Sequence, residues 1–484
     1  MRFTTKVPQL TARAVLAVVP FVDQVRRAAG RQRSYLVGGA IRDAFIGRAC
    51  TDFDFILDDP PKVAAAVARR VGGTLVRLHE AHRTYRVAVR CGGARFDLDF
   101  AAIAPGGLVA DLRARDFTIN ALAAGPLGSR PRLHDPCAAR ADIARGVVRM
   151  TTRQALARDP VRVVRAYRFA ATLGFRLDRR TRRGCGALVG LFPEVAAERL
   201  GGELLLTLGG EAYETPLQAM AEDGVLAALI PEFAPTAGVE QGGVHEFDVA
   251  AHSVLTAVRL AEIMRRPGAF FREHGDRVAG YIADEDTRSG LVLAALLHDV
   301  GKPDRRTWGE RRWRFFGHEE RGAELARQAV SRLCFPRRVR RQVQDLVGSH
   351  MRLLPFMQTD EPTLRARRRF MRDMAPHGIG AVLLALADRR ALRATPEFDD
   401  DEATVRRLAY LLAAGEDDSA GRTQDLPVNG DDLLRLGLAP GPQFKTILEA
   451  VEEQWIAGDL TTREEALAWV RSRYLQEREA SDIG

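Results

Sequence analysis

The chain has 484 residues, of which 46% are hydrophobic, so it can bury several cores, and its length indicates about three or four domains. A net charge of +9 favours a polyanionic partner such as a nucleic acid. No apolar run approaches the ~20 residues of a membrane span, and the odd number of scattered cysteines argues against a disulfide framework, so we expect a cytoplasmic protein with no membrane contact.

The first part of the chain predicts a mixed α/β domain. Residues 14–22 are an apolar stretch that leads into charged residues without a convincing cleavage site, which indicates the start of a helix rather than a signal peptide. From about residue 30, short strands alternate with helical segments. We therefore predict an α/β (α+β) head over residues 1–150.

The segment that begins at Tyr35 has the features of a phosphate-binding turn. Tyr35–Val37 predicts a short strand, and Gly38 and Gly39 follow it directly. Glycines let backbone N–H groups approach a triphosphate closely, and Arg42 lies one turn further, where it could clamp a phosphate. The alternative is an ordinary Gly-Gly turn.

A pair of carboxylates follows on the next predicted strand. Residues 52–57 alternate polar and apolar side chains, so Phe53 and Phe55 should face a core while Asp52 and Asp54 share the other face. Two carboxylates at this spacing can bind Mg²⁺ together with substrate phosphates, and two such ions can stabilise both the attacking and the leaving oxygen of an in-line displacement. The alternative is a solvated strand face.

A second alternating strand, Arg95–Phe100, supplies a third carboxylate from either Asp97 or Asp99, which point to the same face. Together these motifs resemble the class II tRNA nucleotidyltransferase and bacterial poly(A) polymerase family of the polymerase-β-like superfamily. The resemblance implies an α+β polymerase-β-like head and selects Asp99 as the carboxylate that assists Asp52 and Asp54.

The resemblance continues in Leu112–Ala123, which is similar to the family's ribose-recognition motif, Arg-Arg-Asp-Phe-Thr-Ile-Asn-Ala. Ala114 stands in place of the first arginine. The resemblance implies that Arg115, Asp116 and Asn120 contact the sugar and order the nucleotide. A strand-to-helix turn with a charged lip is the alternative.

The segment Ala157–Ala170 resembles the family's base-selecting motif and the helix after it. Pro160 predicts a helix that begins there and places Asp159, Arg162 and Arg165 on one stripe. An adjacent carboxylate and guanidinium match the hydrogen-bonding edge shared by cytosine and adenine, and they mismatch uracil and guanine. We also include Arg168 in the predicted nucleotide site.

Two features of this motif leave its role open. Asp159 could instead be a plain N-cap of the helix. The family usually carries Glu before this Asp, and here the residue is Arg158, so a possible orienting partner is missing. The pattern then turns helical over residues 151–235, which we predict to select the nucleotide and bind RNA.

A second set of chemical residues lies beyond a Pro- and Gly-rich boundary at about residue 235. The apolar run Leu293–Leu297 ends in His298-Asp299, and this resembles the HD phosphohydrolase superfamily, whose metal-ligand signature is an ordered His, His-Asp, Asp. The matching residues are His252, His298, Asp299 and Asp388, with His318 and His350 as further ligands of a second ion.

Imidazoles mixed with carboxylates suit Mn, Ni, Co, Fe or Zn better than Mg²⁺, although Mg²⁺ stays open. Satisfied core or surface histidines are the alternative for any single position. We predict an HD domain over residues 236–400, and the resemblance implies cleavage of phosphomonoesters or 2′,3′-cyclic phosphates.

The last part of the chain, residues 401–484, resembles the tail of HD-containing members of the family. It contains a polar segment from Gly415 to Gln424, which predicts a loop, and then an amphipathic helix. We predict a small helical module that helps to hold RNA.

The sequence therefore predicts an enzyme that adds CCA to tRNA 3′ ends from ATP and CTP, with no protein partner indicated. Within the family, CC-adding, A-adding and poly(A)-adding enzymes share these motifs and stay open. From other classes, the rivals are a metal-dependent phosphohydrolase with an RNA-binding head and a purely structural RNA-binding protein.

Overall fold

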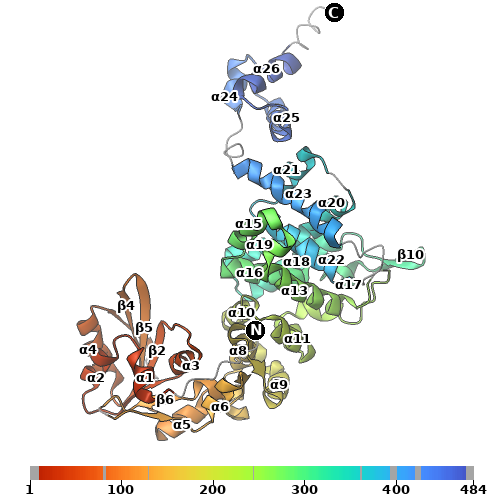
Figure 1. Cartoon of the computed structure of the whole chain (residues 1–484). Coiled ribbons are helices and arrows are strands. Elements are labelled where there is room, and N and C mark those ends of the chain that lie inside the picture. Colours follow the sequence, from red (N-terminus) through yellow and green to blue (C-terminus); the bar gives the residue numbers. More distant parts are fainter. Residues whose placement is uncertain are drawn as a thin grey trace, which may run out of the picture. The chain divides into compact units, whose positions relative to one another are not determined.

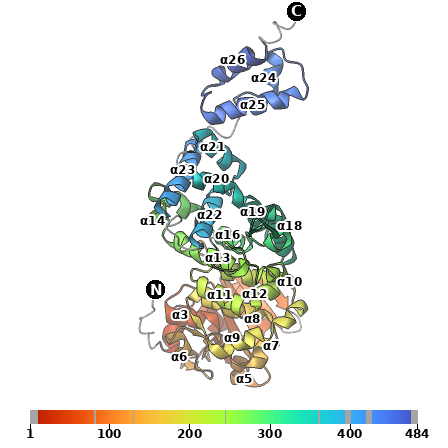
Figure 2. The ribbon, with the colours of Figure 1, turned by 90° about the vertical axis from the view of Figure 1, so that its right-hand side faces the viewer.

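The computed structural model describes residues 10–79, 83–128, 130–243, 245–359, 362–392, 401–419 and 427–475. The chain forms two compact units, Met1–Ile230 and Pro231–Gly484 (Figures 1 and 2). Their division lies close to the boundary predicted at 235, while those predicted at 150 and 400 stay predictions. None of the helices in the described ranges is long and apolar enough to cross a membrane.

The first unit contains a seven-stranded mixed sheet, as the predicted α+β head requires. Within this sheet, as far as it is described, β2 (Asp52–Leu57) and β5 (Ala94–Ala102) pair in parallel and the other neighbouring strands are antiparallel. The strand order is β3-β4-β5-β2-β1-β6-β7. The strands are β1 (Ser34–Val37), β2 (Asp52–Leu57), β3 (Thr74–His79), β4 (Thr84–Cys91), β5 (Ala94–Ala102), β6 (Ala123–Gly125) and β7 (Arg132–His134).

The alternating patterns of β2 and β5 have the predicted effect. Phe53 and Phe55 are buried, and Phe55 stacks on Phe100 with ring centroids 5.5 Å apart. Because successive side chains of a strand point to opposite faces, Asp52 and Asp54 lie on the other face. The helices of this region are α1 (Ala12–Ala17), α2 (Val22–Ala29), α3 (Gly39–Ile46), α4 (Pro60–Val71) and α5 (Gly107–Ala114).

The rest of the first unit is mostly helical and is centred on α8 (Val161–Leu173), which packs against α10 and α11. Tyr167 of α8 is fully buried, and its hydroxyl donates a hydrogen bond of 2.7 Å to Asp223. A two-stranded sheet joins β8 (Val147–Val148) to β9 (Arg176–Leu177). The other helices are α6 (Ala139–Ala144), α7 (Arg153–Ala157), α9 (Arg179–Gly186), α10 (Ala197–Leu208), α11 (Glu214–Glu222) and α12 (Val225–Leu229).

The second unit is built around α16 (Glu285–Leu297), whose residues Leu291–Leu297 are all fully buried. A helix that is apolar on all sides belongs in the middle of a bundle, and α13, α19 and α22 pack against it. A short hairpin of β10 (Thr307–Gly309) and β11 (Arg312–Arg314) interrupts the helices.

The helices around α16 come from a long stretch of sequence. They are α13 (Val249–Arg265), α14 (Pro267–Phe270), α15 (Gly275–Tyr281), α17 (Lys302–Arg305), α18 (His318–Arg332), α19 (Arg337–Ser349), α20 (Leu354–Gln358), α21 (Leu364–Asp373) and α22 (Gly378–Arg390), and a 3₁₀ turn spans His350–Leu353.

The C-terminal helices form the predicted small module, with a core of its own that includes Leu433, Ile447, Val451 and Val470. They are α24 (Gly430–Arg435), α25 (Gln443–Ala457) and α26 (Arg463–Tyr474). The loop predicted from Gly415 to Gln424 is wrong in its first half, because α23 (Asp401–Ser419) continues through it. A single glycine costs a helix only about 1 kcal/mol, which does not by itself end it. Residues 420–424 lie outside the described residues.

Candidate active site and metal centre

The predicted phosphate cradle is a tight turn between β1 and α3. Gly38 has φ +81°, a conformation that favours glycine. A Cβ at this position would lie 2.9 Å from Nη1 of Arg115 and 3.1 Å from Oδ2 of Asp54. A side chain at this position would crowd two predicted site residues from distant parts of the chain, so the position requires glycine. The turn therefore lies directly beside both residues.

The sheet register brings the predicted carboxylates onto adjacent strands. Because β2 and β5 are parallel, Asp54 lies opposite Asp99, and Asp52 lies opposite Asp97. Asp54 is also opposite Val37, the residue before the cradle. The register thus places Asp99, rather than Asp97, directly opposite Asp54, although Asp97 lies on the same face of the sheet.

Arg86 of β4 joins the acidic face, and the sequence prediction missed it. Its guanidinium donates to both oxygens of Asp99, at 2.7 and 2.8 Å, and to Oδ2 of Asp97 at 3.0 Å. Asp97 also accepts from Arg95 at 3.0 Å. The alternation of β4 could have revealed Arg86, because it stands on the polar face directly opposite Asp99.

The pKa of Asp54 is raised above its ordinary value. Surrounding protein groups limit the hydration of its carboxylate, and the negative charges of Asp99 and Asp52 add to this effect, while Arg115 opposes it. A divalent cation would relieve this repulsion, and carboxylate oxygens are the ligands that Mg²⁺ prefers. The donor set therefore fits Mg²⁺.

A continuous polar network connects the cradle to the predicted ribose motif. Arg42 is buried, donates to Asp43 at 2.9 and 3.1 Å, and donates to Oδ1 of Asn120 at 2.6 Å. Asn120 in turn donates to Asp116 at 3.0 Å. A Cβ added at Gly39 would lie 3.2 Å from the guanidinium of Arg42. Arg42 therefore stands next to the cradle and connects the cradle to Asn120 and, through Asn120, to Asp116.

The same network extends into α8 and α10. Arg165 lies 3.6 Å from Asp116 and donates to Glu203 at 2.8 Å. Glu203 also pairs with Arg168 at 2.6 Å. Glu203 was not predicted, and its position on α10, a separate helix, gave the sequence no spacing signal that could have linked it to the two arginines.

Asp159 and Arg162 occupy the start of α8. The cap residue of α8 is Pro160 and no side-chain cap bond forms, so the N-cap alternative for Asp159 is not observed. Oδ2 of Asp159 instead accepts from Arg199 at 2.9 Å. Nη1 of Arg162 donates to the backbone carbonyls of Ala114 and Ala155, which ties α8 to the residue before Arg115. Base reading by this pair stays a prediction.

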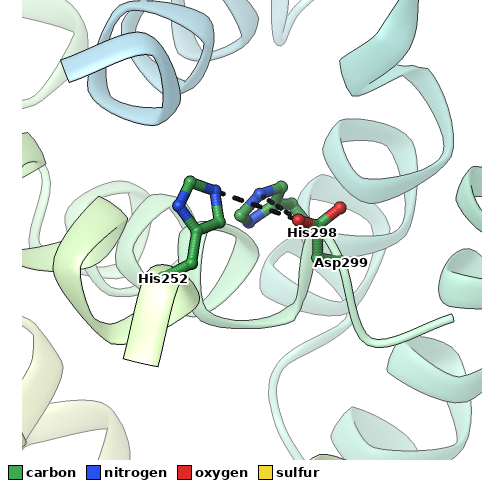
Figure 3. A group of neighbouring side chains, drawn as sticks. All are labelled: His252, His298 and Asp299. Carbon is green, nitrogen blue, oxygen red and sulfur yellow. Dashed lines mark ion pairs between the residues drawn. The ribbon is translucent and has the colours of Figure 1, made fainter. Parts of the chain in front are cut away.

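The second unit brings the four predicted HD residues together from three segments. Figure 3 draws three of them, His252, His298 and Asp299. Nε2 of His252, on α13, lies 2.8 Å from Oδ1 of Asp388, on α22. His298, at the end of α16, lies 3.2 Å from Oδ2 of Asp299 and 3.6 Å from Asp388. Ligand atoms of His252, His298 and Asp299 all lie within 4.8 Å of one another.

His318 and His350 complete a second group that shares Asp299. Oδ1 of Asp299 lies 3.3 Å from Nε2 of His318 and 3.8 Å from Nε2 of His350, while Oδ2 faces His298. The two imidazoles are 3.2 Å apart. The carboxylate can therefore bridge two ions. Among the described residues, these two groups are the sets of three or more ligand atoms close enough for one metal, and Asp52, Asp54 and Asp99 do not form such a set.

Hydrogen bonds orient three of the histidines toward this centre. Nδ1 of His298, His318 and His350 each lies 2.8 Å from a backbone carbonyl three residues earlier in the chain. An N–H donated to a carbonyl leaves Nε2 as the free lone pair, which is the arrangement of metal-binding histidines. Nε2 of His298 is buried without a hydrogen-bond partner. The residues therefore fit a transition metal with nitrogen and oxygen ligands.

Charges inside the centre favour an ionised Asp299. Burial would raise the pKa of its carboxyl, but His298, Lys302 and His318 hold it well below the usual range. Burial lowers the pKa of His350 to about 3, which keeps its imidazole neutral. Lys302 was not predicted as a site residue, and it donates to Asp299 and to Gln241, each at 2.6 Å. The sequence signal that could have revealed Lys302 was its position about one helical turn after Asp299.

Three segments of the chain match known domains. Residues 34–149 match the poly A polymerase head domain, residues 249–392 the HD domain, and residues 383–470 a putative tRNA nucleotidyltransferase domain 2.

Several curated relatives are similar over most of the chain. The A-adding tRNA nucleotidyltransferase of Deinococcus radiodurans is 33% identical over 92% of this chain and 96% of that protein. The CC-adding tRNA nucleotidyltransferase of Thermus thermophilus is 33% identical over 90% of this chain and 93% of that protein. The multifunctional CCA protein of Pseudomonas fluorescens is 32% identical over 66% of this chain and 74% of that protein.

Solved structures share the fold. The CCA-adding enzyme of Thermotoga maritima in complex with tRNA superposes with a TM-score of 0.64 at 21% identity, covering 96% of this chain and 98% of that one. A CCA-adding enzyme with CTP gives a TM-score of 0.65 at 20% identity, with the same coverage. The first two sequence relatives, whose matches cover at least 90% of both chains, show that this chain belongs to the tRNA nucleotidyltransferase family, as its motifs predicted.

Proposed function

We propose that the chain adds nucleotides of the CCA sequence to the 3′ end of tRNA from CTP and ATP, without a nucleic-acid template. The observation that carries the proposal is the position of Gly38, where an added Cβ would lie 3.1 Å from Asp54 and 2.9 Å from Arg115, so that cradle, acidic strand and ribose motif adjoin one another. Nucleotidyl transfer needs these three parts around one triphosphate.

Each part has a role in the proposed reaction. Asp52 and Asp54, with Asp99 assisting, would hold Mg²⁺, which when bound stabilises the attacking and leaving oxygens. Gly38 and Gly39 leave room for the triphosphate. The Arg42–Asn120–Asp116 network positions the ribose site, and Glu203 fixes Arg165 and Arg168 behind it. Asp159 would read the base either through Oδ1 or after release from Arg199.

Complete CCA addition is the activity predicted from the sequence, and partial addition is a second candidate. The relatives that match over nine tenths of the chain are named for adding A or CC, whereas the match to the multifunctional CCA protein covers two thirds. Asp159 and Arg162 match an edge that cytosine and adenine share, so they do not separate the candidates.

The test uses three tRNA transcripts, which lack CCA, lack only the final A, or are mature. Each is incubated with the protein and one or both nucleotides, and the products are sequenced. CCA addition predicts a full end on the first transcript. A CC-adding enzyme would stop after two nucleotides, and an A-adding enzyme would extend only the second transcript. Long A tails on RNA other than tRNA would contradict all three.

We also propose that the HD centre hydrolyses phosphoesters at RNA 3′ ends. The support is the convergence of ligand atoms of His252, His298 and Asp299, with Asp388 beside both histidines, at 2.8 Å from His252 and 3.6 Å from His298. A bound metal there would supply charge stabilisation and an activated water. If the protein hydrolyses phosphoesters and incorporates no nucleotide, it is instead a phosphohydrolase whose head only binds RNA. A cytoplasmic location follows from the proposed tRNA substrate.

A further inference from the structure

A hairpin joins two helices that carry residues of the HD centre. It consists of β10 and β11, and it lies between Lys302 at the start of α17 and His318 at the start of α18. Figure 1 shows this hairpin extending away from the helices of its unit. The proposed activities leave it without a role.

The hairpin exposes aromatic side chains. Trp308 and Trp313 are cross-strand partners, with ring centroids 4.7 Å apart and the rings at 72°. Trp308 is 62% exposed, and Phe316, just beyond β11, is 78% exposed. Single exposed apolar residues are common, but two large aromatic side chains on one short protruding element mark a binding surface.

The same element is strongly cationic. Residues 305–316 contain five arginines and one acidic residue, Glu310, which forms an ion pair with Arg314. The guanidinium of Arg306 lies over the ring of Trp313 at 3.6 Å. Arg312 and Arg314 pair across the strands with Gly309 and Thr307, so they lie on the face opposite the tryptophans. On the tryptophan face, Arg306 against Trp313 and the exposed ring of Trp308 together suit a strand of nucleotides, which offers phosphates and bases together, while Arg312 and Arg314 add positive charge to the element.

The base of the hairpin is fixed to the metal centre. The backbone carbonyl of Phe315 accepts from Nδ1 of His318 at 2.8 Å, and the ammonium of Lys302 lies 5.5 Å from the ring of Phe315. Trp308 stands opposite Trp313, two residues before Phe315. At about 3.4 Å per strand residue, the exposed ring begins about 7 Å beyond the residue that orients His318.

We propose that the β10–β11 hairpin binds the single-stranded 3′ end of RNA by stacking a base on Trp308, and so holds the terminal phosphate at the HD centre. This rests on the proposed hydrolysis at that centre and adds its substrate class: an RNA end with unpaired nucleotides, rather than a free mononucleotide. In the step itself, water adds to phosphorus and one P–O ester bond breaks. The leaving ester oxygen takes up a proton and becomes a hydroxyl group.

The kinetic test compares an unpaired RNA octamer ending in a 2′,3′-cyclic phosphate with 2′,3′-cyclic AMP, which is too short to span centre and hairpin. In Trp308→Ala, KM for the octamer should rise about tenfold, since base stacking on an aromatic ring supplies binding of this order. Hydrolysis of cyclic AMP should not change. Trp308→Phe should retain most of the octamer affinity. Leu354→Ala, which removes another exposed apolar side chain of this unit, should have no effect.

If the wild type hydrolyses neither substrate, the proposed hydrolysis is contradicted. A second measurement tests the RNA contact even in that case. The tryptophan fluorescence of Trp308 is obtained as the difference between the spectra of wild type and Trp308→Phe. Addition of an octamer with a 3′-hydroxyl should quench this fluorescence, and the quenching should be weaker at high salt. An unquenched difference signal, or equal octamer KM values for wild type and Trp308→Ala, would overturn the proposed RNA contact and leave a protein partner as the occupant of this surface.

Discussion

Asp54 is the residue at which the parts of the transferase site meet. Its carboxylate lies beside the cradle glycine, opposite Asp99 in the register and next to the charge of Arg115. Reduced hydration and two neighbouring carboxylates raise its pKa, so it accepts a proton more readily than an ordinary aspartate. In the proposed Mg²⁺ site, a proton and the metal ion would compete for the same carboxylate oxygens.

This competition predicts a pH dependence of nucleotide incorporation. At limiting Mg²⁺, kcat/KM should fall as the pH drops through the raised pKa of Asp54, at a higher pH than the ordinary value of 3.8 would give. Higher Mg²⁺ should move the fall to lower pH. The measurement is kcat/KM against pH at two Mg²⁺ concentrations.

The matched control is Asp54→Asn, which keeps the shape and removes the charge. It should lower incorporation by about 10³-fold, the equivalent of several kcal/mol of lost metal stabilisation, and leave HD hydrolysis unchanged. A pH profile that does not move with Mg²⁺ would contradict the assigned role.

At the scale of elements, the turn between β1 and α3 is constrained from both sides. Gly38 precedes α3 and Gly47 follows it, and both have positive φ, +81° and +70°. A Cβ at Gly38 would meet Arg115 and Asp54, whereas a Cβ at Gly47 would meet nothing within 4 Å. Gly47 therefore serves as a control for a positive-φ glycine of the same helix that has no site residue beside it.

Gly38→Ala should lower incorporation by at least about tenfold, because the added methyl group displaces Arg115 or Asp54 and misplaced catalytic groups cost up to about 10²-fold. Gly47→Ala places alanine in the left-handed helical region, a strain of about 1 kcal/mol, and should lower stability while incorporation by the folded enzyme is retained. Equal losses of activity in the two variants would show that crowding is unimportant.

Helix α16 carries the HD motif, and its start depends on Asp284. The carboxylate accepts from the backbone N–H and the hydroxyl of Thr287, each at 2.8 Å, and from Arg338 at 2.6 Å. These bonds, those of Thr287 first, lower the pKa of Asp284. A lowered pKa means that the charged form stabilises the fold. Its contribution is present above the unfolded pKa, near 3.8, and is lost as the pH falls through the folded pKa.

Asp284→Ala should destabilise the second unit by about 1 kcal/mol at neutral pH, the usual value of a helix cap. The difference from wild type should shrink as the pH falls below 3.8. Asp284→Asn keeps a capping oxygen and should lose less. Thermal unfolding of the three proteins at neutral and acidic pH measures this, and a pH-independent difference would contradict the charge contribution.

At the scale of the whole molecule, the metal sites predicted for the two units differ in composition. The first unit offers carboxylates on adjacent strands, and the second offers imidazoles with carboxylates. Oxygen ligands favour Mg²⁺, while mixed nitrogen and oxygen ligands favour transition metals.

We therefore expect the two activities to separate after metal removal. Following chelation and dialysis, Mg²⁺ alone should restore incorporation, and HD hydrolysis should require Mn²⁺, Ni²⁺, Co²⁺, Fe²⁺ or Zn²⁺. Assays of both activities on the same metal-free protein provide the measurement. Recovery of hydrolysis with Mg²⁺ alone, at the Mg²⁺ concentration that restores incorporation, would contradict this assignment.

The sequence by itself determined the local elements and the chemical groups. Alternation predicted β2 and β5, the Gly-Gly pair predicted the turn, and the order of His252, His298, Asp299 and Asp388 predicted their convergence, because these signals depend on neighbouring residues or on motif order. Only the tertiary structure decided which groups meet. The β2–β5 register put Asp99 opposite Asp54, and pairing or packing of separate elements brought Arg86 to Asp99, Glu203 to Arg165 and Trp308 to Trp313. Alternation can place a residue such as Arg86 on a polar face, but which residues meet is set by register and packing across long stretches of chain, which the local pattern does not encode.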